Sequence, residues 1–357
     1  MVKQKIYTAL GLMSGTSLDG IDAAIIKTDG QSVDYFGPFV SKPYSQEFRN
    51  RLRRELGKRD VSHLLQKDLT CLHAALVEDL FYKHGYIRSE IDIVGFHGQT
   101  IHHDAKKGFT LQIGDGALLA KLLGTSVVNN FRSADIAAGG QGAPLAPIYH
   151  QALARKFSDP TVIVNIGGVA NVSFISDEYL LAFDTGPGNA LIDDFIKQKV
   201  GASFDKDGEI ARQGRVNEEV LANLLNDPYF SKMPPKSLDR NEFDFLNVEN
   251  LLVEDAAATL VAFTTETIVR SLEYFPQPVQ RWLITGGGRH NSYMMGELSK
   301  CLGTRVIPVE EVGWNGDALE AQAFAFLAVR SLLNLPLSFP NTTGVPKELT
   351  GGDIYRQ

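Results

Sequence analysis

Residues 6–27 read IYTALGLMSGTSLDGIDAAIIK and contain two apolar segments separated by a short polar one. Residues 6–13 and 21–27 have the length and apolar character of buried β-strands. The segment between them consists of Ser, Gly, Thr and Asp apart from Leu18, a composition typical of turns. The run therefore predicts a β-hairpin with a small and polar tip.

A similar pattern returns in the second half of the chain. Residues 161–166 (TVIVNI) are a predicted buried strand, followed by the turn GGVAN and a second strand at 172–175. Residues 180–183 form a further strand that leads through DTGPGN, at 184–189, into a helix at 190–200. The two copies share pattern rather than letters. Two related α/β domains facing a shared cleft would explain the repetition.

Helical and strand patterns alternate over the rest of the chain, which favours the α/β class. Predicted helices are residues 46–56, 61–84, 116–123, 253–275, 292–302 and 319–334, and further predicted strands are 91–96, 109–113, 282–285 and 305–308. Residues 208–243 are polar and contain three prolines, so we expect a surface excursion there. The tail after Pro336 is expected to be loop.

The length of 357 residues exceeds what one hydrophobic core usually supports, so two domains are expected. The glycine-rich stretch 138–144 interrupts the periodicity and is either a hinge or a ligand loop. We therefore expect a first domain at 1–132 and a second at 133–334. The final segment, 335–357, is expected to return to the first.

Composition narrows the class of partner. The formal net charge of -7 gives no general attraction for nucleic acid or an anionic membrane. Only two cysteines occur, Cys71 and Cys301, so a disulfide framework is not indicated and a reducing cytoplasm is favoured. No apolar stretch approaches the ~20 residues of a membrane span. We expect a cytoplasmic protein with small-molecule ligands.

Four glycine-containing turns, at 15–20, 167–168, 186–188 and 286–288, follow predicted strands. Open α/β sheets bind ligands at the ends of their strands, and glycine-rich turns offer backbone N–H groups to phosphate oxygens. The spacings match neither a P-loop nor a dinucleotide fingerprint. Together the turns favour phosphate binding, and Asp19 and Asp22 could hold a hydrated magnesium ion. The turn at 15–20 alone is equally explained by a hairpin that needs small residues, and any single glycine turn after a strand is weak evidence.

Asp184 stands where a predicted buried strand meets a glycine loop. A carboxylate there can accept a proton from a hydroxyl or a water molecule. The alternative is an aspartate that caps the following helix, although Pro187 and Gly188 intervene. His97, His102 and His103 suggest a metal, but no second cluster completes a tetrahedral set. Asp317 and Glu320 are either surface acids at a helix start or ligand contacts.

The segment GLMSGTSLDGID, residues 11–22, resembles the long and specific signature of the anhydro-N-acetylmuramic acid kinase family. The resemblance continues, in order, at seven further segments. These are HGQT (97–100), FR (131–132) with Asp135, GGQGAP (139–144), NIGGVAN (165–171), FDTGPGN (183–189), TGGG (285–288) with Asn291, and EA (320–321) with AFA (323–325). It covers almost the whole chain.

This resemblance implies two ribonuclease-H-like domains of the actin-like ATPase type, with ATP and Mg²⁺ in an interdomain cleft. It also implies that 1,6-anhydro-N-acetylmuramic acid is opened by water and phosphorylated on O6 in one site. The products would be N-acetylmuramic acid 6-phosphate and ADP, in cell-wall recycling. A homodimer is implied as well.

Carried over by position, Asp184 is the base that activates water for attack on the anomeric carbon. The resemblance places ATP at three segments: Gly15, Thr16, Ser17, Leu18, Asp19, Gly20, Ile21 and Asp22; Asn165, Gly167, Gly168 and Asn171; and Gly286, Gly287, Gly288 and Asn291. Asp19 and Asp22 are expected to hold Mg²⁺ through water. Thr100, Arg132, Gln141 and Glu320 are the expected sugar contacts.

One position departs from the family pattern. After HGQT the family usually has valine or isoleucine, then arginine and histidine, whereas here Ile101 is followed by His102. If that arginine steadies the sugar carboxylate, affinity or substrate identity changes. Two alternatives stand beside the anhydro-sugar kinase: another sugar or carboxylate kinase of the same superfamily, or a nucleotide-driven switch without a sugar substrate.

Overall fold

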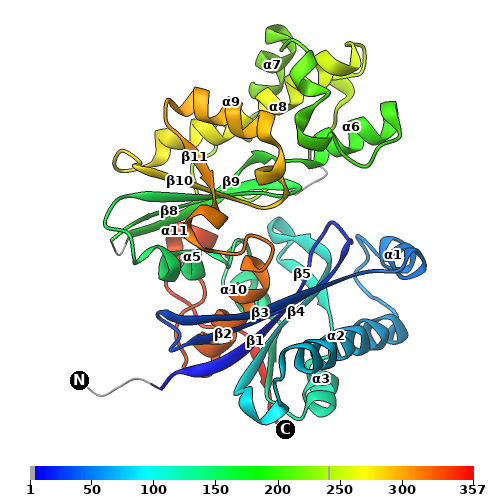
Figure 1. The fold of residues 1–357 in the computed structure, drawn as a ribbon, viewed down its shortest axis with the longest axis vertical. Helices are drawn as coiled ribbons and strands as arrows, with labels where there is room; N and C mark the ends of the chain where they lie inside the picture. The colour runs from blue at the N-terminus through cyan, green and yellow to red at the C-terminus, as the bar shows by residue number, and fades with distance from the viewer. Residues whose placement is uncertain (1–4, 178, 240–241) are drawn as a thin grey trace. The chain divides into compact units, whose positions relative to one another are not determined.

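The protein is described from a computed structural model, which covers residues 5–177, 179–239 and 242–357. It divides into two compact units: unit 1 is Met1–Leu153 with Ala318–Gln357, and unit 2 is Ala154–Asp317 (Figure 1). These limits differ from the expected domains 1–132 and 133–334. One reason is that α10 (Leu319–Leu332) packs on β1, β2 and β4 of unit 1. Another is α5 (Pro147–Ala154), where the Tyr149 hydroxyl donates to Gln322 of α10 at 2.8 Å.

Unit 1 is built on a mixed seven-stranded sheet. Across the sheet the order is β12 (Asp353–Tyr355), β6 (Val127–Asn129), β4 (Ile93–Asp104), β1 (Tyr7–Ser14), β2 (Gly20–Thr28) and β3 (Val33–Pro43), with β5 (Phe109–Ile113) paired to the far end of β4. Strands β1, β2 and β3 pair antiparallel, whereas β4 and β6 run parallel to β1. The C-terminal segment therefore returns to this sheet through β12.

Helices cover both faces of the first sheet. Leu10 and Leu12 of β1 join a core with α2 (His63–His84) and α3 (Gly116–Leu123). Because side chains alternate along a strand, Gly11 faces the other side, where α10 lies. A Cβ atom at Gly11 would lie 1.7 Å from the Ala321 carbonyl oxygen, and one at Gly95 would lie 2.0 Å from that of Phe324. Glycine at these two positions lets the helix backbone touch the sheet.

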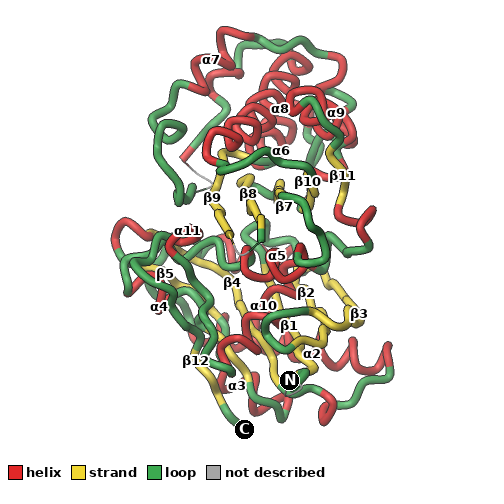
Figure 2. The backbone as a smooth tube through the Cα atoms, turned by 90° about the vertical axis from the view of Figure 1, so that its left-hand side faces the viewer, coloured by secondary structure: helices red, strands yellow, loops and turns green. Residues whose placement is uncertain are grey.

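Unit 2 is built on a mixed five-stranded sheet. Its order is β11 (Val306–Pro308), β10 (Arg281–Thr285), β7 (Thr161–Ile166), β8 (Val169–Ser176) and β9 (Tyr179–Pro187). One face carries Val162, Val164, Val172 and Phe183, which pack in a core with α6 (Ala190–Val200), α8 (Val253–Val269) and α9 (Ser292–Leu302). Figure 2 shows these helices beside the strands of this sheet.

The two sheets share one topology. In each, three consecutive strands form an antiparallel meander, and two later strands lie in parallel order beside the first: β3-β2-β1-β4-β6 in unit 1 and β9-β8-β7-β10-β11 in unit 2. This 3-2-1-4-5 order is that of the ribonuclease-H-like domain. The expected α/β class with two such domains is confirmed.

Several expected elements need correction. The predicted helix 253–275 ends as an α-helix at Val269 and continues as a 3-10 turn, Arg270–Tyr274. The tail is not entirely loop, because it contains α11 (Pro340–Thr343) and β12. Strands β3 and β6 and the helix α4 (Ser133–Ala137) were not predicted. Helices α1 (Gln46–Arg53) and α2 follow the predicted pattern.

The segment 208–243 is not simply a surface excursion. Its described part contains α7 (Glu218–Leu225) and buries Tyr229 and Lys236. Among the described residues, no helix combines the length and the apolarity that crossing a membrane requires.

Candidate active site

The first glycine turn joins β1 to β2, as expected. Thr16, Ser17 and Asp19 are exposed, whereas Leu18 and Ile21 are buried in the core of unit 1. The Leu18 N–H donates to the Gly15 carbonyl at 3.2 Å, which closes the turn. A ligand at this turn would therefore meet hydroxyl groups and backbone, while the Leu18 and Ile21 side chains serve packing.

A buried polar network supports this turn from below. The Ser14 hydroxyl donates to Gln99 Oε1 at 2.5 Å and lies 2.5 Å from the Tyr44 hydroxyl, and Gln99 Nε2 donates to the Gly15 carbonyl at 3.1 Å. Burial raises the pKa of Tyr44 well above its usual value, and the charges of Asp19 and Asp22 raise it further. Tyr44 therefore stays a neutral hydrogen-bonding group that fixes the turn.

Asp19 and Asp22 are suited to a hard divalent cation. Asp19 is exposed and Asp22 is half-buried, and both act electrostatically on the Tyr44 hydroxyl. Carboxylates are the protein ligands that Mg²⁺ prefers, and Mg²⁺ usually keeps several waters and substrate oxygens. Among the described residues, no group of three His, Cys, Asp or Glu is placed to hold a metal ion. The residues fit an ion held partly by phosphate and water.

Two of the expected sugar contacts, Thr100 and Gln141, belong to one hydrogen-bonded network in unit 1. Gln112 Nε2 donates to the hydroxyl of Thr100 at 3.3 Å and to that of Thr110 at 2.8 Å. His103 joins Thr110 to Gln141, with its Nδ1 3.0 Å from the Thr110 hydroxyl and its Nε2 2.9 Å from the Gln141 carbonyl. The network therefore connects Thr100 to the glycine-rich segment 138–144.

Arg132 reaches the same segment from the start of α4. Its Nη1 donates to the Gly142 carbonyl at 2.7 Å, and its Nη2 lies 3.0 Å from Nε2 of the buried His97. The buried carboxylate of Asp135 accepts from the Gly142 N–H at 2.5 Å and from the Thr343 hydroxyl. Glu320, the fourth candidate, is exposed in the first turn of α10, next to the Ala321 carbonyl that packs on Gly11.

In unit 2 a row of polar residues crosses the sheet near the ends of its strands. Thr285 of β10 pairs with Asn165 of β7, Asn165 with Asn171 of β8, and Asn171 with Asp184 of β9. Residues that pair directly across strands point to the same face. This face is opposite to the one that packs on α6, α8 and α9, because neighbouring residues such as Val164 and Phe183 belong to that core. Three predicted residues, Asn165, Asn171 and Asp184, are thus brought together.

Asp184 lies inside β9 rather than after its end. The pairing shifts here, since Asn171 faces Asp184 while Ala170 faces Gly186, which leaves Thr185 as an extra residue. The N-cap residue of α6 is Asn189, whereas the Asp184 side chain contacts the segment that follows α7. Its Oδ2 accepts from the Leu238 N–H at 2.9 Å, and its backbone carbonyl accepts from the Tyr229 hydroxyl at 2.6 Å. The strand irregularity and these contacts place a buried carboxylate at the end of the polar row.

The turn at Gly167 and Gly168 joins β7 to β8 and is bonded to the start of α6. The Asn189 N–H donates to the Gly167 carbonyl at 2.7 Å, and the Gly188 N–H donates to the Gly168 carbonyl at 2.9 Å. Asn189 Nδ2 also donates to the Ile166 carbonyl at 3.0 Å. The second and third glycine turns therefore form one connected structure at the end of the sheet.

The last glycine turn, 286–288, lies against the same structure. A Cβ atom at Gly286 would be 2.4 Å from Asn165 Oδ1, so Gly286 directly adjoins the polar row. Arg289 holds the turn in place through two hydrogen bonds. Its Nη1 donates to the Gly286 carbonyl at 2.9 Å, and its Nη2 donates to Asp317 at 2.6 Å. Asn291 caps α9, because its Oδ1 accepts from the Met294 N–H at 3.0 Å. That contact gives Asn291 a structural role besides the predicted one.

The comparisons with known proteins agree with the resemblance seen in the sequence. The sequence pattern of the anhydro-N-acetylmuramic acid kinase family matches residues 7–357. The chain belongs to this family. It is 52% identical over 348 residues to the anhydro-N-acetylmuramic acid kinase of Paramagnetospirillum magneticum, covering 96% of this chain and 98% of that protein. It is 51% identical over 354 residues to the enzyme of the same name from Rhodospirillum rubrum, covering 97% and 94%.

Among solved structures, component A of the (R)-2-hydroxyglutaryl-CoA dehydratase from Acidaminococcus fermentans aligns with 92% of this chain and 99% of its own. Its TM-score is 0.48 at 10% identity, a similarity that adds nothing to the argument from strand order.

His102, where the family usually has arginine, lies on β4 after an irregularity in its pairing with β5. Its ring packs edge-on to the ring of Phe109, with the two ring centroids 5.2 Å apart. Its Nδ1 is buried without a hydrogen-bond partner among the described residues. His103 points into the Thr110 and Gln141 network instead. The two histidines thus have different partners, because neighbouring side chains on a strand point to opposite faces.

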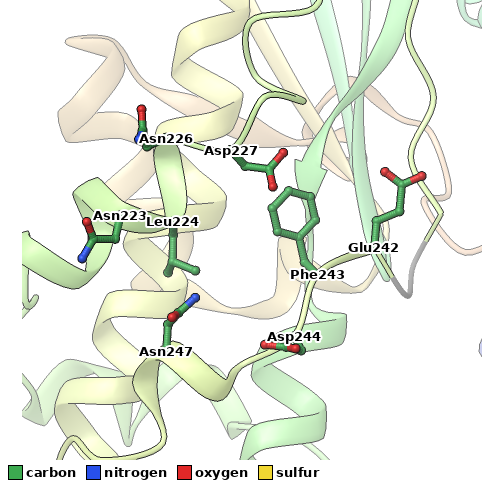
Figure 3. Close-up of a pocket in the computed structure, with 8 residues that line it drawn as sticks. All are labelled: Asn223, Leu224, Asn226, Asp227, Glu242, Phe243, Asp244 and Asn247. Atoms are coloured by element: carbon green, nitrogen blue, oxygen red, sulfur yellow. The ribbon is translucent and has the colours of Figure 1, made fainter.

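A separate pocket in unit 2 contains none of the predicted residues. It is lined by Asn223, Leu224, Asn226, Asp227, Glu242, Phe243, Asp244 and Asn247 (Figure 3). Of its acidic side chains, Asp227 follows α7, and Glu242 and Asp244 precede the 3-10 turn Leu246–Val248. It therefore plays no part in the candidate site.

Sequence reasoning missed the residues that contact Asp184. Tyr229, Lys236 and Leu238 lie in the segment read as a surface excursion. The signal available in the sequence was an aromatic pair, Tyr229 and Phe230, followed closely by the lysine at 236 within an otherwise polar stretch. Trp282 and Trp314 are buried.

Proposed function

We propose that this protein uses ATP to convert 1,6-anhydro-N-acetylmuramic acid and water into N-acetylmuramic acid 6-phosphate and ADP. The observation that carries the proposal is the family match, which extends from residue 7 to residue 357 and reaches 52% identity over almost the full length of a relative. The polar row ending in Asp184 and the glycine turns beside it are consistent with that chemistry.

Asp184 is the base in this proposal. It takes a proton from a water molecule, whose oxygen forms a bond to the anomeric carbon while the bond from that carbon to O6 breaks. Oxygen O6 becomes bonded to the transferred phosphoryl group, so no free alkoxide has to be released. A positioned general base contributes about 10²–10⁴-fold to such a step. The Leu238 N–H on Oδ2 gives the carboxylate a defined orientation.

The glycine turns take the phosphates of ATP. The Thr16 and Ser17 hydroxyls of unit 1 are exposed donors, and the resemblance assigns the turns of unit 2 at Gly167–Gly168 and Gly286–Gly288 to the same nucleotide. Asp19 and Asp22 would hold Mg²⁺ through water. When bound, Mg²⁺ supplies charge neutralisation for phosphoryl transfer, which depends mainly on positioning and electrostatics.

The sugar contacts are Thr100, Arg132, Gln141 and Glu320. The guanidinium of Arg132 is the cation suited to the carboxylate of the sugar's lactyl group, because arginine binds carboxylates in a fixed geometry. His102 replaces an arginine of the family, so Arg132 carries this recognition without that second cation.

We further infer from the resemblance that the protein acts in the cytoplasm as a homodimer, in peptidoglycan recycling. The thiols of Cys71 and Cys301 are free and exposed, a state that a reducing compartment preserves.

A substrate panel tests the proposed function. The purified protein with ATP and Mg²⁺ is assayed for ADP release with anhydro-N-acetylmuramic acid, N-acetylglucosamine, glucose or acetate, and without acceptor. Turnover with the anhydro-sugar alone is expected. Preference for glucose, N-acetylglucosamine or acetate would instead support another kinase of the superfamily, which the His102 difference leaves open. Acceptor-independent turnover would support a nucleotide-driven switch.

A further inference from the structure

The segment 229–238 contacts Asp184 at three atoms. The Tyr229 hydroxyl donates to the Asp184 carbonyl at 2.6 Å, the Asp184 N–H donates to the Lys236 carbonyl at 2.9 Å, and the Leu238 N–H donates to Asp184 Oδ2 at 2.9 Å. We call Tyr229, Lys236 and Leu238 the Asp184 clasp. The segment contains no α-helix or strand, and the clasp holds it against β9.

Lys236 occupies the interior of this clasp. Its side chain is buried, and Nζ lies 4.9 Å from the ring centroid of Tyr229, 5.2 Å from that of Tyr274 and 5.9 Å from that of Phe183. Nζ also donates to the carbonyls of Tyr229 and Phe230, each at 3.4 Å. The ammonium group therefore joins both ends of the segment to the strand residue that precedes Asp184.

A buried lysine at this place is costly unless something compensates for its lost hydration. Within the described part of the chain, no carboxylate forms an ion pair with it, and the charges that act on its pKa are those of Lys232 and Glu273. Burial lowers the pKa of Lys236 to about 8, and the charge of Lys232 adds to this effect. Aromatic faces and carbonyl oxygens are what hold the cation. An apolar side chain would fill this space without such a cost, so packing alone does not account for lysine.

We propose that Lys236 is a positioning residue for Asp184: its ammonium group fixes the segment 229–238 on β9 and so holds the carboxylate in its working orientation. The inference rests on the role proposed above for Asp184. A base must be placed closely to act, and a misplacement of about 1 Å can cost about 100-fold in rate. Lys236 contacts no reacting atom in this account.

Four variants test the proposal. Lys236→Met keeps the length of the side chain and removes the charge, whereas Lys236→Arg keeps a cation that binds carbonyls and aromatic faces. Tyr229→Phe removes only the hydroxyl that donates to Asp184. Lys232→Met is the matched control, because Lys232 is exposed and its Nζ lies 5.2 Å from the same Tyr229 ring.

Steady-state kinetics with the anhydro-sugar and ATP, melting temperatures and amide hydrogen exchange are measured for each variant. In Lys236→Met we expect kcat to fall about 10- to 100-fold, with the KM values for both substrates nearly unchanged and faster exchange of the Asp184 amide. Lys236→Arg should recover most of kcat, Tyr229→Phe should lose part of it, and Lys232→Met should match the wild type.

Wild-type kcat in Lys236→Met would overturn the inference, as would a loss that Lys236→Arg does not recover and that accompanies a lower melting temperature. If Lys236→Met fails to fold, Tyr229→Phe decides by the same kcat criterion. An inactive wild type would contradict the proposed function instead. In that case amide hydrogen exchange at Asp184 is the deciding measurement. An exchange rate that is unchanged in both Lys236→Met and Tyr229→Phe would reject the clasp.

Discussion

The carboxylate of Asp184 combines burial with a defined hydrogen-bond partner, and this combination allows its chemical role to be separated from its structural one. In Asp184→Asn the side-chain carbonyl can still accept from the Leu238 N–H, but it cannot accept a proton from water. We expect product formation to fall by at least about 100-fold while ATP binding, measured by calorimetry, stays near normal. A fully active variant would remove Asp184 from the mechanism.

The tautomer of His97 follows from its hydrogen-bond partners. Its Nδ1 lies 2.8 Å from the Gly98 carbonyl, so Nδ1 carries the hydrogen and Nε2 accepts from Arg132. Burial lowers the pKa of His97 well below its usual value, and the charge of Arg132 lowers it further. If Arg132 binds the sugar carboxylate, His97→Phe should raise the KM for the sugar about tenfold, in line with loss of a hydrogen bond to a charged group.

In that variant the KM for ATP should be unchanged. His84→Phe is the control, since His84 is exposed. Equal sugar KM values in wild type and His97→Phe would show that the Arg132 contact with His97 does not matter for recognition.

At the scale of elements, the packing of α10 on the first sheet depends on glycine. In Gly95→Ala the new Cβ would lie 2.0 Å from the Phe324 carbonyl oxygen, which is backbone and cannot rotate away. Overpacking of this kind costs about 1–3 kcal/mol, so the midpoint of urea unfolding should fall. Gly296→Ala in α9 is the control, because nothing lies within 4 Å of its added Cβ. That variant should be slightly more stable, and an equal midpoint for Gly95→Ala and wild type would contradict the packing argument.

The elements also show what the sequence reveals. Both hairpins, β1–β2 and β7–β8, were predicted because their strands are continuous apolar runs around glycine turns. Strand β3 was missed because its residues are exposed or half-buried and it contains Gly37 and Pro38, so it has no apolar pattern. Strands β6 and β12 have three residues each, too few for periodicity. The pairing of Asn165, Asn171 and Asp184 needs the register of three strands, which no local pattern contains.

At the scale of the whole molecule, buried histidines predict sensitivity to acid. Burial lowers the pKa of His73 to about 3 and that of His150 to about 4, both below the unfolded value of about 6.5. At pH values between the folded-state and the unfolded-state pKa of each histidine, the unfolded chain binds more protons than the folded one. Stability therefore rises with pH in this window and is lost as the pH falls below about 6.5, by up to about 1.4 kcal/mol per pH unit for each group.

His73→Leu tests this dependence, because both ring nitrogens of His73 are buried without hydrogen-bond partners among the described residues. The melting temperature of this variant should fall less than that of the wild type between about pH 7 and pH 5. His84→Leu should follow the wild type. Parallel curves for His73→Leu and wild type would mean that His73 does not set the acid limit.

The central claim is that one protein opens an anhydro-sugar with water and phosphorylates the oxygen thereby released. Its most direct test is mass spectrometry of the product formed from anhydro-N-acetylmuramic acid, ATP and Mg²⁺ in ¹⁸O-labelled water. The account predicts one ¹⁸O atom on the anomeric carbon and the phosphate on O6 of the same molecule. A phosphorylated product that retains the anhydro ring, or a label absent from the anomeric oxygen, would contradict it.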